Sequence, residues 1–328
     1  MIISRTPLRI SFFSGGSDMP SFFRKENGAA LSVTIDKYIY VMTHNPPHMD
    51  FRTIYDDIQH SASLDLLQHD ITRETLRYFN VEDTITTASI SDIVAKGSGL
   101  GSSSAFTVGL INCMTSNKKM DDRQRYLAKI ACDIEIGRCG YPIGKQDQYA
   151  AAYGGLNYFR FLKDDSVEVI KTEVKTEVLN DLNNNLLLVF SGKTRSAVAI
   201  LEKQNEAMLD DTKFTLVANG RNKALKAIDI LERGSLDDFG YLLDMAWMDK
   251  KRVTKEISND YFDHIYKTAI ENGAYGGKLL GAGGGGFFIF YVKPENREKV
   301  SLAVTKDTEC KIYDFKFTNE GSKIIGVG

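Results

Sequence analysis

The sequence predicts an α+β fold in two domains, because strands and helices are grouped along the chain and do not alternate strictly. Its 328 residues exceed the usual length of one domain. The character of the chain changes over residues 163–184, where charged and polar residues replace the apolar runs. We therefore predict a domain boundary there and divide the chain into residues 1–175 and 176–328.

The first half opens with strand-like segments at residues 2–13 and 31–42, which are rich in Ile, Val, Tyr and Phe. Shorter segments at 51–55 and 84–91 also predict strands. A broken apolar stripe predicts a helix near residues 62–79. Strands therefore dominate this part of the chain.

A loop rich in glycine and serine follows at residues 97–104 and leads into a segment that ends near Met114. That segment is apolar on nearly all sides, which indicates a buried helix. Residues 121–138 predict an amphipathic helix with Asp121 or Asp122 as its N-cap.

The second half begins with a continuous apolar strand at residues 186–190. Helical periodicity then dominates residues 194–271, with interruptions expected at Gly220, Gly234 and Gly240. The end of the chain predicts a strand, a glycine-rich loop, a strand, a helix and a strand, at residues 276–280, 281–286, 287–293, 295–305 and 310–317.

Composition and charge exclude several classes of protein. The 41 Lys and Arg residues nearly balance the 43 Asp and Glu residues, which argues against a dedicated nucleic-acid binder. No apolar stretch reaches the roughly 18 residues of a membrane helix. The first residues lack the features of a signal peptide, and the histidines and cysteines form no metal-binding pattern. We therefore expect a cytoplasmic enzyme that binds neither nucleic acid nor membrane.

The loop GSGLGSSS at residues 97–104 is the strongest local signal. Its glycines allow successive backbone amides to point into one concavity, and the N-terminus of the following helix adds partial positive charge. Both features favour a bound phosphate. The serines can cap the helix, donate to phosphate oxygens or bind Mg²⁺. The alternative is a plain linker whose serine caps the helix.

Two other glycine patterns do not fit established nucleotide-binding motifs. Before Gly192-Lys193-Thr194, Leu187 stands where a Walker A loop needs its first glycine. The run GAGGGG at residues 281–286 has dinucleotide-binding spacing, but a strand follows it instead of a helix. Because five of its six residues are glycine, we expect this loop to lie close to a ligand or another loop.

Three segments together resemble the GHMP small-molecule kinases, which include galactokinase, homoserine kinase and mevalonate kinase. They are residues 6–18, which run from TPLRIS to GGSD, residues 97–105, and residues 278–286, which read KLLGAGGGG. Their order and spacing cover nearly the whole chain. The resemblance implies a ribosomal-protein-S5-like N-terminal domain, a ferredoxin-like C-terminal domain, and the use of ATP and Mg²⁺.

Finer features resemble the D-glycero-D-manno-heptose 7-phosphate kinases, namely TIDKY at 34–38, GKQDQYAA at 144–151 and FSGKTR at 190–195. The sequence departs from that group at Ser14 and Ser17, where Gly and Thr are usual. The implied reaction moves the γ-phosphoryl of ATP to the anomeric hydroxyl of the sugar phosphate, giving the 1,7-bisphosphate. The alternatives are another sugar 1-kinase, such as a fucokinase, and a sugar or ATP sensor without catalysis.

The resemblance also assigns the catalytic and metal residues. Asp147 matches the catalytic aspartate, and Arg9 matches the basic residue that would pair with it. Glu135 and Ser103 match the Mg²⁺ ligands, with Ser104 as the alternative serine. Without the family resemblance, the alternative interpretations are that Asp147 caps a helix and that Glu135 lies on a solvated helix face. The residues expected at the ATP phosphates are Gly97, Gly99, Gly101, Ser102, Ser103 and Ser104.

The sugar site is expected around Asp18, whose carboxylate can accept bonds from adjacent hydroxyls. The remaining candidates for substrate binding are Gly15, Gly16, Gln146, Lys193 and Arg195. Of these, Lys193 and Arg195 suit an anionic group on the substrate, although they can also form a cationic surface turn. Arg52 and Lys37 are weaker candidates of the same kind. A homodimer is compatible with the sequence.

Overall fold

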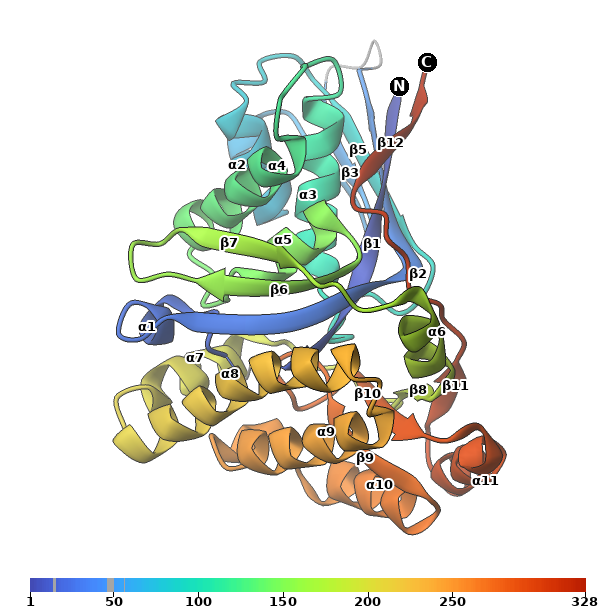
Figure 1. The fold of residues 1–328 in the computed structure, drawn as a ribbon. Coiled ribbons are helices and arrows are strands. Elements are labelled where there is room, and N and C mark those ends of the chain that lie inside the picture. The colour runs from blue at the N-terminus through green and yellow to red at the C-terminus, as the bar shows by residue number, and fades with distance from the viewer. Residues whose placement is uncertain (14–15, 46–49, 56) are drawn as a thin grey trace.

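The computed structural model describes residues 1–13, 16–45, 50–55 and 57–328, and it confirms the predicted α+β fold (Figure 1). Two sheets organise the molecule. The larger has eight strands: six lie in the order β12-β1-β2-β5-β3-β4, β6 also pairs with β2, and β7 pairs with β6. The smaller has four strands in the order β11-β8-β10-β9.

Two long strands form the centre of the larger sheet. β1 (Ile2–Phe13) pairs antiparallel with β2 (Gly28–His44), and their register shifts at Pro7, whose nitrogen has no hydrogen to donate. One half of β2 pairs with β5 and the other half with β6, so β2 spans the sheet. The remaining strands are β3 (Phe51–Ile54), β4 (Ile58–Ser61), β5 (Thr86–Ser91), β6 (Leu156–Phe161), β7 (Val167–Lys171) and β12 (Lys323–Val327).

A helical layer covers one face of this sheet (Figure 1). Its central member, α3 (Ser102–Met114), packs on β1 and β2 and is buried on nearly all sides, as predicted. The predicted cap Asp122 accepts a hydrogen bond from the Arg125 amide at the start of α4. The other helical segments are α1 (Pro20–Phe23), η1 (Leu64–Leu66), α2 (Asp70–Tyr78), α4 (Arg123–Cys132), η2 (Asp133–Arg138) and α5 (Gln146–Tyr153).

The smaller sheet lies beneath the larger one and is covered by long helices (Figure 1). Every residue of β8 (Leu186–Phe190) and β10 (Phe287–Val292) is buried, as their continuous apolar sequences predict. Its edge strands are β9 (Ala274–Leu279) and β11 (Lys311–Tyr313). The helical segments of this half are α6 (Thr176–Asn184), α7 (Val198–Ala207), α8 (Asp211–Glu232), α9 (Leu236–Lys251), η3 (Lys255–Ile257), α10 (Asp260–Glu271) and α11 (Pro294–Thr305).

Two of the three predicted helix interruptions are wrong. Gly234 does separate α8 from α9, but Gly220 and Gly240 lie inside these helices and are buried. A Cβ on Gly240 would lie 2.6 Å from the Tyr291 ring, so this glycine permits close packing of α9 on the smaller sheet. The helix predicted at 62–79 is also shorter than expected, because α2 begins only after His69.

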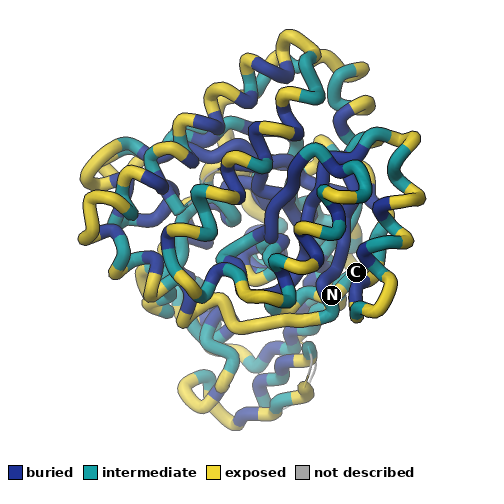
Figure 2. The backbone as a smooth tube through the Cα atoms, turned by 90° about the horizontal axis from the view of Figure 1, so that it is seen from below, coloured by how far each residue is buried: buried dark blue, intermediate teal, exposed yellow. Residues whose placement is uncertain are grey.

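The two halves share an interior. The ring of Phe12 on β1 packs edge-on against Phe239 on α9, with 5.1 Å between the ring centroids. The proposed boundary at residue 175 falls between β7 and α6, and the last strand, β12, pairs with β1 in the larger sheet. The N- and C-termini therefore lie side by side (Figure 1). The buried segments run through the middle of the molecule, with exposed loops and outer helices around them (Figure 2).

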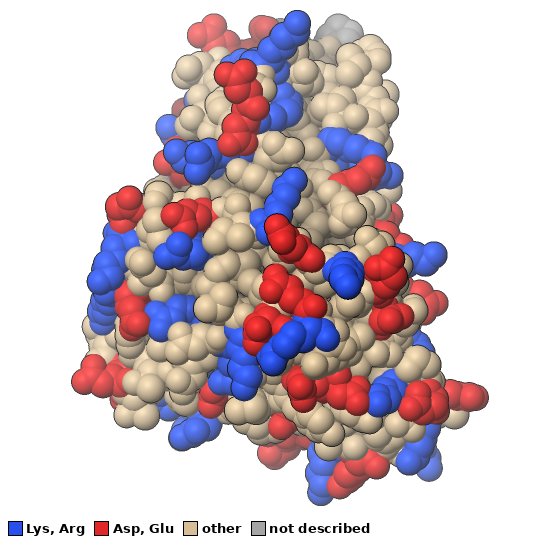
Figure 3. Space-filling view, viewed as in Figure 1, with Lys and Arg blue, Asp and Glu red and all other residues tan. Residues whose placement is uncertain are grey.

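The surface carries both signs of charge. On the face seen in Figure 3, basic and acidic side chains are interspersed. This arrangement agrees with the nearly balanced composition. Within the described parts of the chain, no helix combines the length and the apolar character needed to cross a membrane.

Candidate active site

The loop at residues 97–104 has the backbone shape of an anion cradle. Gly97, Gly99 and Gly101 all adopt left-handed φ angles, of 66°, 77° and 75°. The buried Leu100 side chain anchors the loop, and the Arg9 amide donates to the Leu100 carbonyl at 3.0 Å. Because α3 begins directly after Gly101, the free amides of its first turn lie at the end of this loop.

Three of the four serines in the loop follow its last glycine, and each of their hydroxyls has a partner. Ser102 Oγ donates to the Ala95 carbonyl at 2.5 Å and so closes the base of the loop. Ser103 Oγ donates to Glu135 Oε1 at 2.7 Å. Ser104 is buried and also hydrogen-bonds toward Glu135. Both serines considered as metal ligands therefore face the predicted metal-binding carboxylate.

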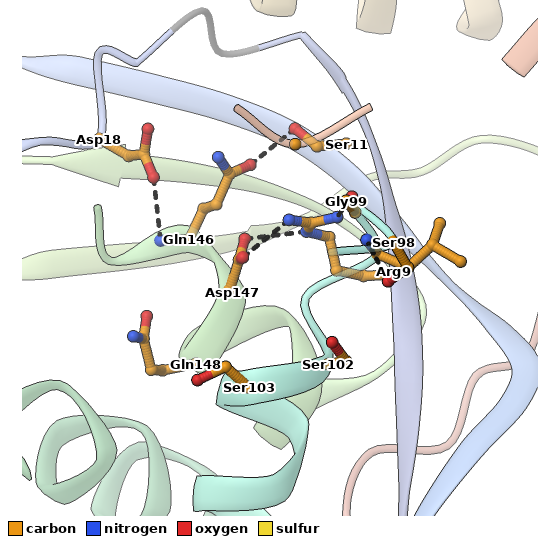
Figure 4. Close-up of polar contacts among 12 residues, drawn as sticks. Arg9, Ser11, Asp18, Ser98, Gly99, Ser102, Ser103, Gln146, Asp147 and Gln148 are labelled. Atoms are coloured by element: carbon orange, nitrogen blue, oxygen red, sulfur yellow. Dashed lines mark hydrogen bonds and ion pairs between the residues drawn. The ribbon is translucent and has the colours of Figure 1, made fainter. Parts of the chain in front are cut away.

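Arg9 and Asp147 meet in a two-point ion pair (Figure 4). Arg9 Nε donates to Asp147 Oδ1 at 2.8 Å, and Nη2 donates to Oδ2 at 2.7 Å. The remaining terminal nitrogen, Nη1, donates to the Gly99 carbonyl at 2.7 Å. Arg9 is almost fully buried, whereas about a quarter of the Asp147 side chain is exposed. The aspartate is thus held firmly but stays accessible.

Glu135 is fully buried in a short π-helical segment, η2, that continues α4. Its second oxygen, Oε2, accepts a hydrogen bond from Gln148 Nε2 at 2.7 Å. Burial raises the pKa of the Glu135 carboxyl, and the hydrogen bonds from Ser103, Ser104 and Gln148 oppose this rise. A buried carboxylate is costly unless a cation or hydrogen bonds balance its charge.

These residues fit a Mg²⁺ ion. Glu135 and Ser103 offer hard oxygen atoms, which Mg²⁺ prefers, and within the described chain no Lys or Arg forms an ion pair with Glu135. The described residues hold no cluster of three or more His, Cys, Asp or Glu side chains that could bind a metal. An ion here would therefore depend on phosphate and water oxygens for its other ligands.

The proposed sugar-binding residues gather at the start of α5, in the same turn as Asp147. The Gln146 amide donates to Asp18 Oδ2 at 3.4 Å, and Ser11 Oγ donates to Gln146 Oε1 at 2.6 Å (Figure 4). A Cβ on Gly144 would lie 2.0 Å from Asp18 Oδ2, so glycine is required for this approach. Gly16 has a left-handed φ of 90°, while Gly15 lies outside the described residues.

The two cations predicted for an anionic substrate differ in their surroundings. Lys193 Nζ is paired with Glu309 Oε1 at 2.7 Å. Arg195 lies beside two glycine loops, since a Cβ on Gly97 or on Gly284 would contact it. Arg195 is an exposed residue, and its side chain forms no ion pair with another residue in the described chain. Arg195 therefore stays free to bind an anion.

The weaker cationic candidates are already paired with acidic neighbours. Arg52 Nε lies 3.0 Å from Asp50 Oδ1, and Lys37 Nζ lies 3.7 Å from Asp36 Oδ1. Neither pair involves a residue of the two glycine loops.

The second glycine run, residues 281–286, joins β9 to β10 and lies against the first loop. A Cβ on Gly281 would be 2.6 Å from Gly99 Cα, and the Phe287 amide donates to the Ser98 carbonyl at 3.0 Å. The expected close approach to another loop is confirmed.

Sequence reasoning missed three side chains at this site. Gln148 directly follows the predicted aspartate, and only its position in the motif GKQDQ pointed to it. Lys278 opens the third motif, and Lys250 lies in no motif. The Lys250 amine ends at the second glycine loop, and the Lys278 amine ends at the Phe12 carbonyl.

Comparison with known proteins places this site in a family. Residues 66–155 match the model of the GHMP kinases N terminal domain, and residues 224–309 match the model of the GHMP kinases C terminal domain. The chain is 30% identical over 334 residues to the D-glycero-alpha-D-manno-heptose 7-phosphate kinase of Campylobacter jejuni, with 98% of each chain covered. It is 25% identical to the bifunctional fucokinase/GDP-fucose pyrophosphorylase of Arabidopsis thaliana, covering 68% of this chain and 22% of that one.

The fold agrees with these matches. A crystal structure of a D-glycero-D-manno-heptose 1-phosphate kinase from Bacteroides thetaiotaomicron superposes with a TM-score of 0.79, covering 100% of both chains at 24% identity. The fold, the anion cradle and the matched models define a small-molecule kinase. The chain belongs to the GHMP kinase family. It is thus an ATP-dependent kinase, and the relatives named above include sugar kinases.

Proposed function

We propose that this enzyme transfers the γ-phosphoryl of ATP to the anomeric hydroxyl of D-glycero-D-manno-heptose 7-phosphate, giving the 1,7-bisphosphate. The observation that carries the proposal is the contact chain from Asp147 through Arg9 to the Gly99 carbonyl. It joins the anion cradle to the residues around Asp18. The full-length similarity to a heptose 7-phosphate kinase supports this choice of sugar.

The ATP phosphates are proposed to bind the amides of residues 97–104, where the cradle and the start of α3 combine. Ser103 and Glu135 are the proposed protein ligands of Mg²⁺, and Gln148 holds the second oxygen of Glu135. A bound Mg²⁺ ion would neutralise charge on the β- and γ-phosphates.

In the proposed transfer, the anomeric oxygen forms a bond to the γ-phosphorus as the bond to the bridging β–γ oxygen breaks, and ADP leaves. The hydroxyl proton passes to the Asp147 carboxylate, which also orients the hydroxyl. Arg9 holds that carboxylate at two points and adds positive charge beside the group in transfer. Phosphoryl transfer needs mainly alignment and charge stabilisation, and this arrangement provides both.

The sugar is proposed to lie near Asp18, Gly16 and Gln146, where a carboxylate and an amide side chain can bond adjacent hydroxyls. Gly15 belongs to the same proposed site. Arg195 is the proposed partner of the 7-phosphate, since the residue is exposed and lies beside both glycine loops. Lys193 is the weaker partner, because Glu309 already engages its amine.

A sugar kinase for an unphosphorylated substrate is the second candidate, and the similarity to a fucokinase favours it. A coupled ADP-release assay with heptose 7-phosphate, heptose and fucose separates the two. We expect turnover chiefly with the 7-phosphate, and phosphorus NMR coupling to the anomeric proton should locate the new phosphate. Faster turnover of fucose would replace the proposal with the second candidate. ATP binding without turnover of any sugar would indicate a sensor.

A further inference from the structure

Two lysine amines end close to each other, one at the second glycine loop and one at the end of β1. Lys278, on β9, is only 5% exposed, and its Nζ donates to the Phe12 carbonyl at the end of β1 at 2.7 Å. Lys250, near the end of α9, donates to the Leu279 carbonyl at 2.9 Å and to the Gly281 carbonyl at 2.6 Å. Both amines therefore lie where the second glycine loop meets the cradle and β1.

Positive charge exceeds negative charge at this junction. Arg9 is close enough to repel both lysines, and the lysines repel each other. Across the described chain, Asp147 is the one carboxylate that forms an ion pair with any of these three cations.

The nearby acids of α9 are engaged elsewhere. Asp244 accepts from the Tyr266 hydroxyl at 2.5 Å, and Asp249 pairs with Lys223 at 2.6 Å. The residues that face the two lysine amines are thus Arg9 and backbone carbonyls, and the aromatic ring of Trp247 lies 5.9 Å from Lys250 Nζ.

Burial and the charge of Arg9 lower the pKa of Lys278 to about 7. Burial also holds the pKa of Lys250 well below its usual range, with repulsion from Lys278 and Arg9 adding to the effect. An anion placed at this junction would favour the charged form of both amines. The two lysine amines therefore have no carboxylate partner, and a bound anion would supply the missing negative charge.

We propose that Lys278 and Lys250, together with Arg9, bind a phosphate anion at the junction of the two glycine loops, and that Lys278 takes up a proton when the anion arrives. Lys278 is the stronger member because one of its three donors is used, whereas Lys250 uses two. This inference rests on the proposed function and adds two residues to its anion site. The phosphate belongs either to ATP or to the sugar phosphate.

Calorimetric titration tests the proposal without turnover. A non-hydrolysable ATP analogue and heptose 7-phosphate are titrated separately near pH 8, each in two buffers with different ionisation enthalpies. We expect uptake of up to about one proton for the ligand whose phosphate occupies the junction. The titration that shows this uptake identifies the source of the phosphate. Binding of both ligands to the wild type without any proton uptake would overturn the proposal.

Three variants make the test specific. Lys278→Met should lose the uptake and weaken that ligand about tenfold or more. Lys278→Arg keeps the charge at every working pH, so it should lose the uptake and retain affinity within about threefold. Lys267→Met is the control, because Lys267 is exposed on α10 and pairs with Glu271. Lys267→Met should change neither the proton uptake nor the ligand affinity.

The outcomes separate this proposal from the proposed function. Wild-type uptake and affinity in Lys278→Met would overturn the anion site even if the enzyme is an active sugar kinase. Absence of turnover with every sugar would overturn the proposed function and leave the binding measurements decisive for the anion site. If Lys278→Met shows no cooperative thermal unfolding, the Lys278→Arg titration decides the question, because loss of uptake there supports the site and retained uptake refutes it.

Discussion

Arg9 Nε and Nη2 hold the two carboxylate oxygens of Asp147 at 2.8 and 2.7 Å, which joins the first strand of the chain to helix α5. The first turn of α5 carries Gln146, Asp147 and Gln148, and each side chain has a different partner. Gln146 bonds to Ser11, Asp147 to Arg9 and Gln148 to Glu135. One helical turn thereby links the proposed sugar, transfer and metal sites.

Asp147→Asn should lower turnover by about 10²- to 10⁴-fold, because the amide cannot accept the hydroxyl proton. ATP affinity should change little, since the cradle and Glu135 are untouched. Steady-state kinetics and calorimetry measure the two quantities. The loss should be less than additive with Arg9→Ala, because the two residues act as a pair. Asp229→Asn, which alters an exposed pair with Arg233, is the control. Wild-type turnover of Asp147→Asn would remove this residue from the mechanism.

Gln148→Leu should raise the Mg²⁺ concentration needed for half-maximal rate by about tenfold or more, because it removes the donor that orients Glu135. The maximal rate at high Mg²⁺ should fall much less. A titration of rate against free Mg²⁺ distinguishes these effects. Calorimetry of ATP without metal should match the wild type and shows that the cradle is intact. An unchanged Mg²⁺ requirement would contradict the role assigned to Gln148.

Gly99→Ala should weaken ATP binding by about tenfold or more, because the new Cβ would lie 2.6 Å from the Leu280 carbonyl and push the two glycine loops apart. Gly140→Ala is a matched control. Gly140 has a similar φ of 69°, but a Cβ there meets nothing within 4 Å. Both variants should lose about 1–2 kcal/mol of stability through backbone strain. Equal ATP affinities in the two variants would show that the contact between loops is unimportant.

Arg195→Ala should reduce kcat/KM for a sugar phosphate by about 10- to 100-fold relative to its unphosphorylated sugar, since a charge-assisted contact contributes about 1.5–3 kcal/mol. Lys193→Ala should have a smaller effect, because Glu309 already binds that amine. Both kinetic constants are compared for the two substrates. Equal losses on both sugars would show that Arg195 does not recognise the phosphate.

The free energy of unfolding should depend on pH through Lys278. Its pKa is about 7 in the folded protein and 10.5 in the unfolded chain, so the unfolded chain binds more protons between these values. Stability from this group should therefore rise as pH increases from about 7 toward 10, by up to about 1.4 kcal/mol per pH unit. Urea unfolding of the wild type and Lys278→Met near pH 7 and pH 9 measures the difference. A constant difference would contradict the lowered pKa.

Local sequence patterns were sufficient for much of the candidate site. The alternating glycines at 97–101 indicated a concavity of backbone amides, and the resemblance of the first motif to a kinase family implied that Arg9 would pair with Asp147. Local sequence patterns did not identify Lys250, Lys278 or Gln148 as residues of the site. An isolated lysine or glutamine has no local signature of its role, because that role depends on which neighbours the fold supplies. Lys278 meets the Phe12 carbonyl across a separation of 266 residues.

In the fold, too, some elements follow from the local sequence and others from contacts between distant segments. By itself the sequence determined the strands β8 and β10 and the buried helix α3, because continuous apolar runs can be satisfied only in the interior. The tertiary structure alone decided that β12 returns to pair with β1 and that Gly240 continues a helix. A short edge strand has little apolar signal, and a glycine in a helix is tolerated when a ring such as Tyr291 packs on it. Both outcomes depend on contacts between distant segments, which local propensity does not contain.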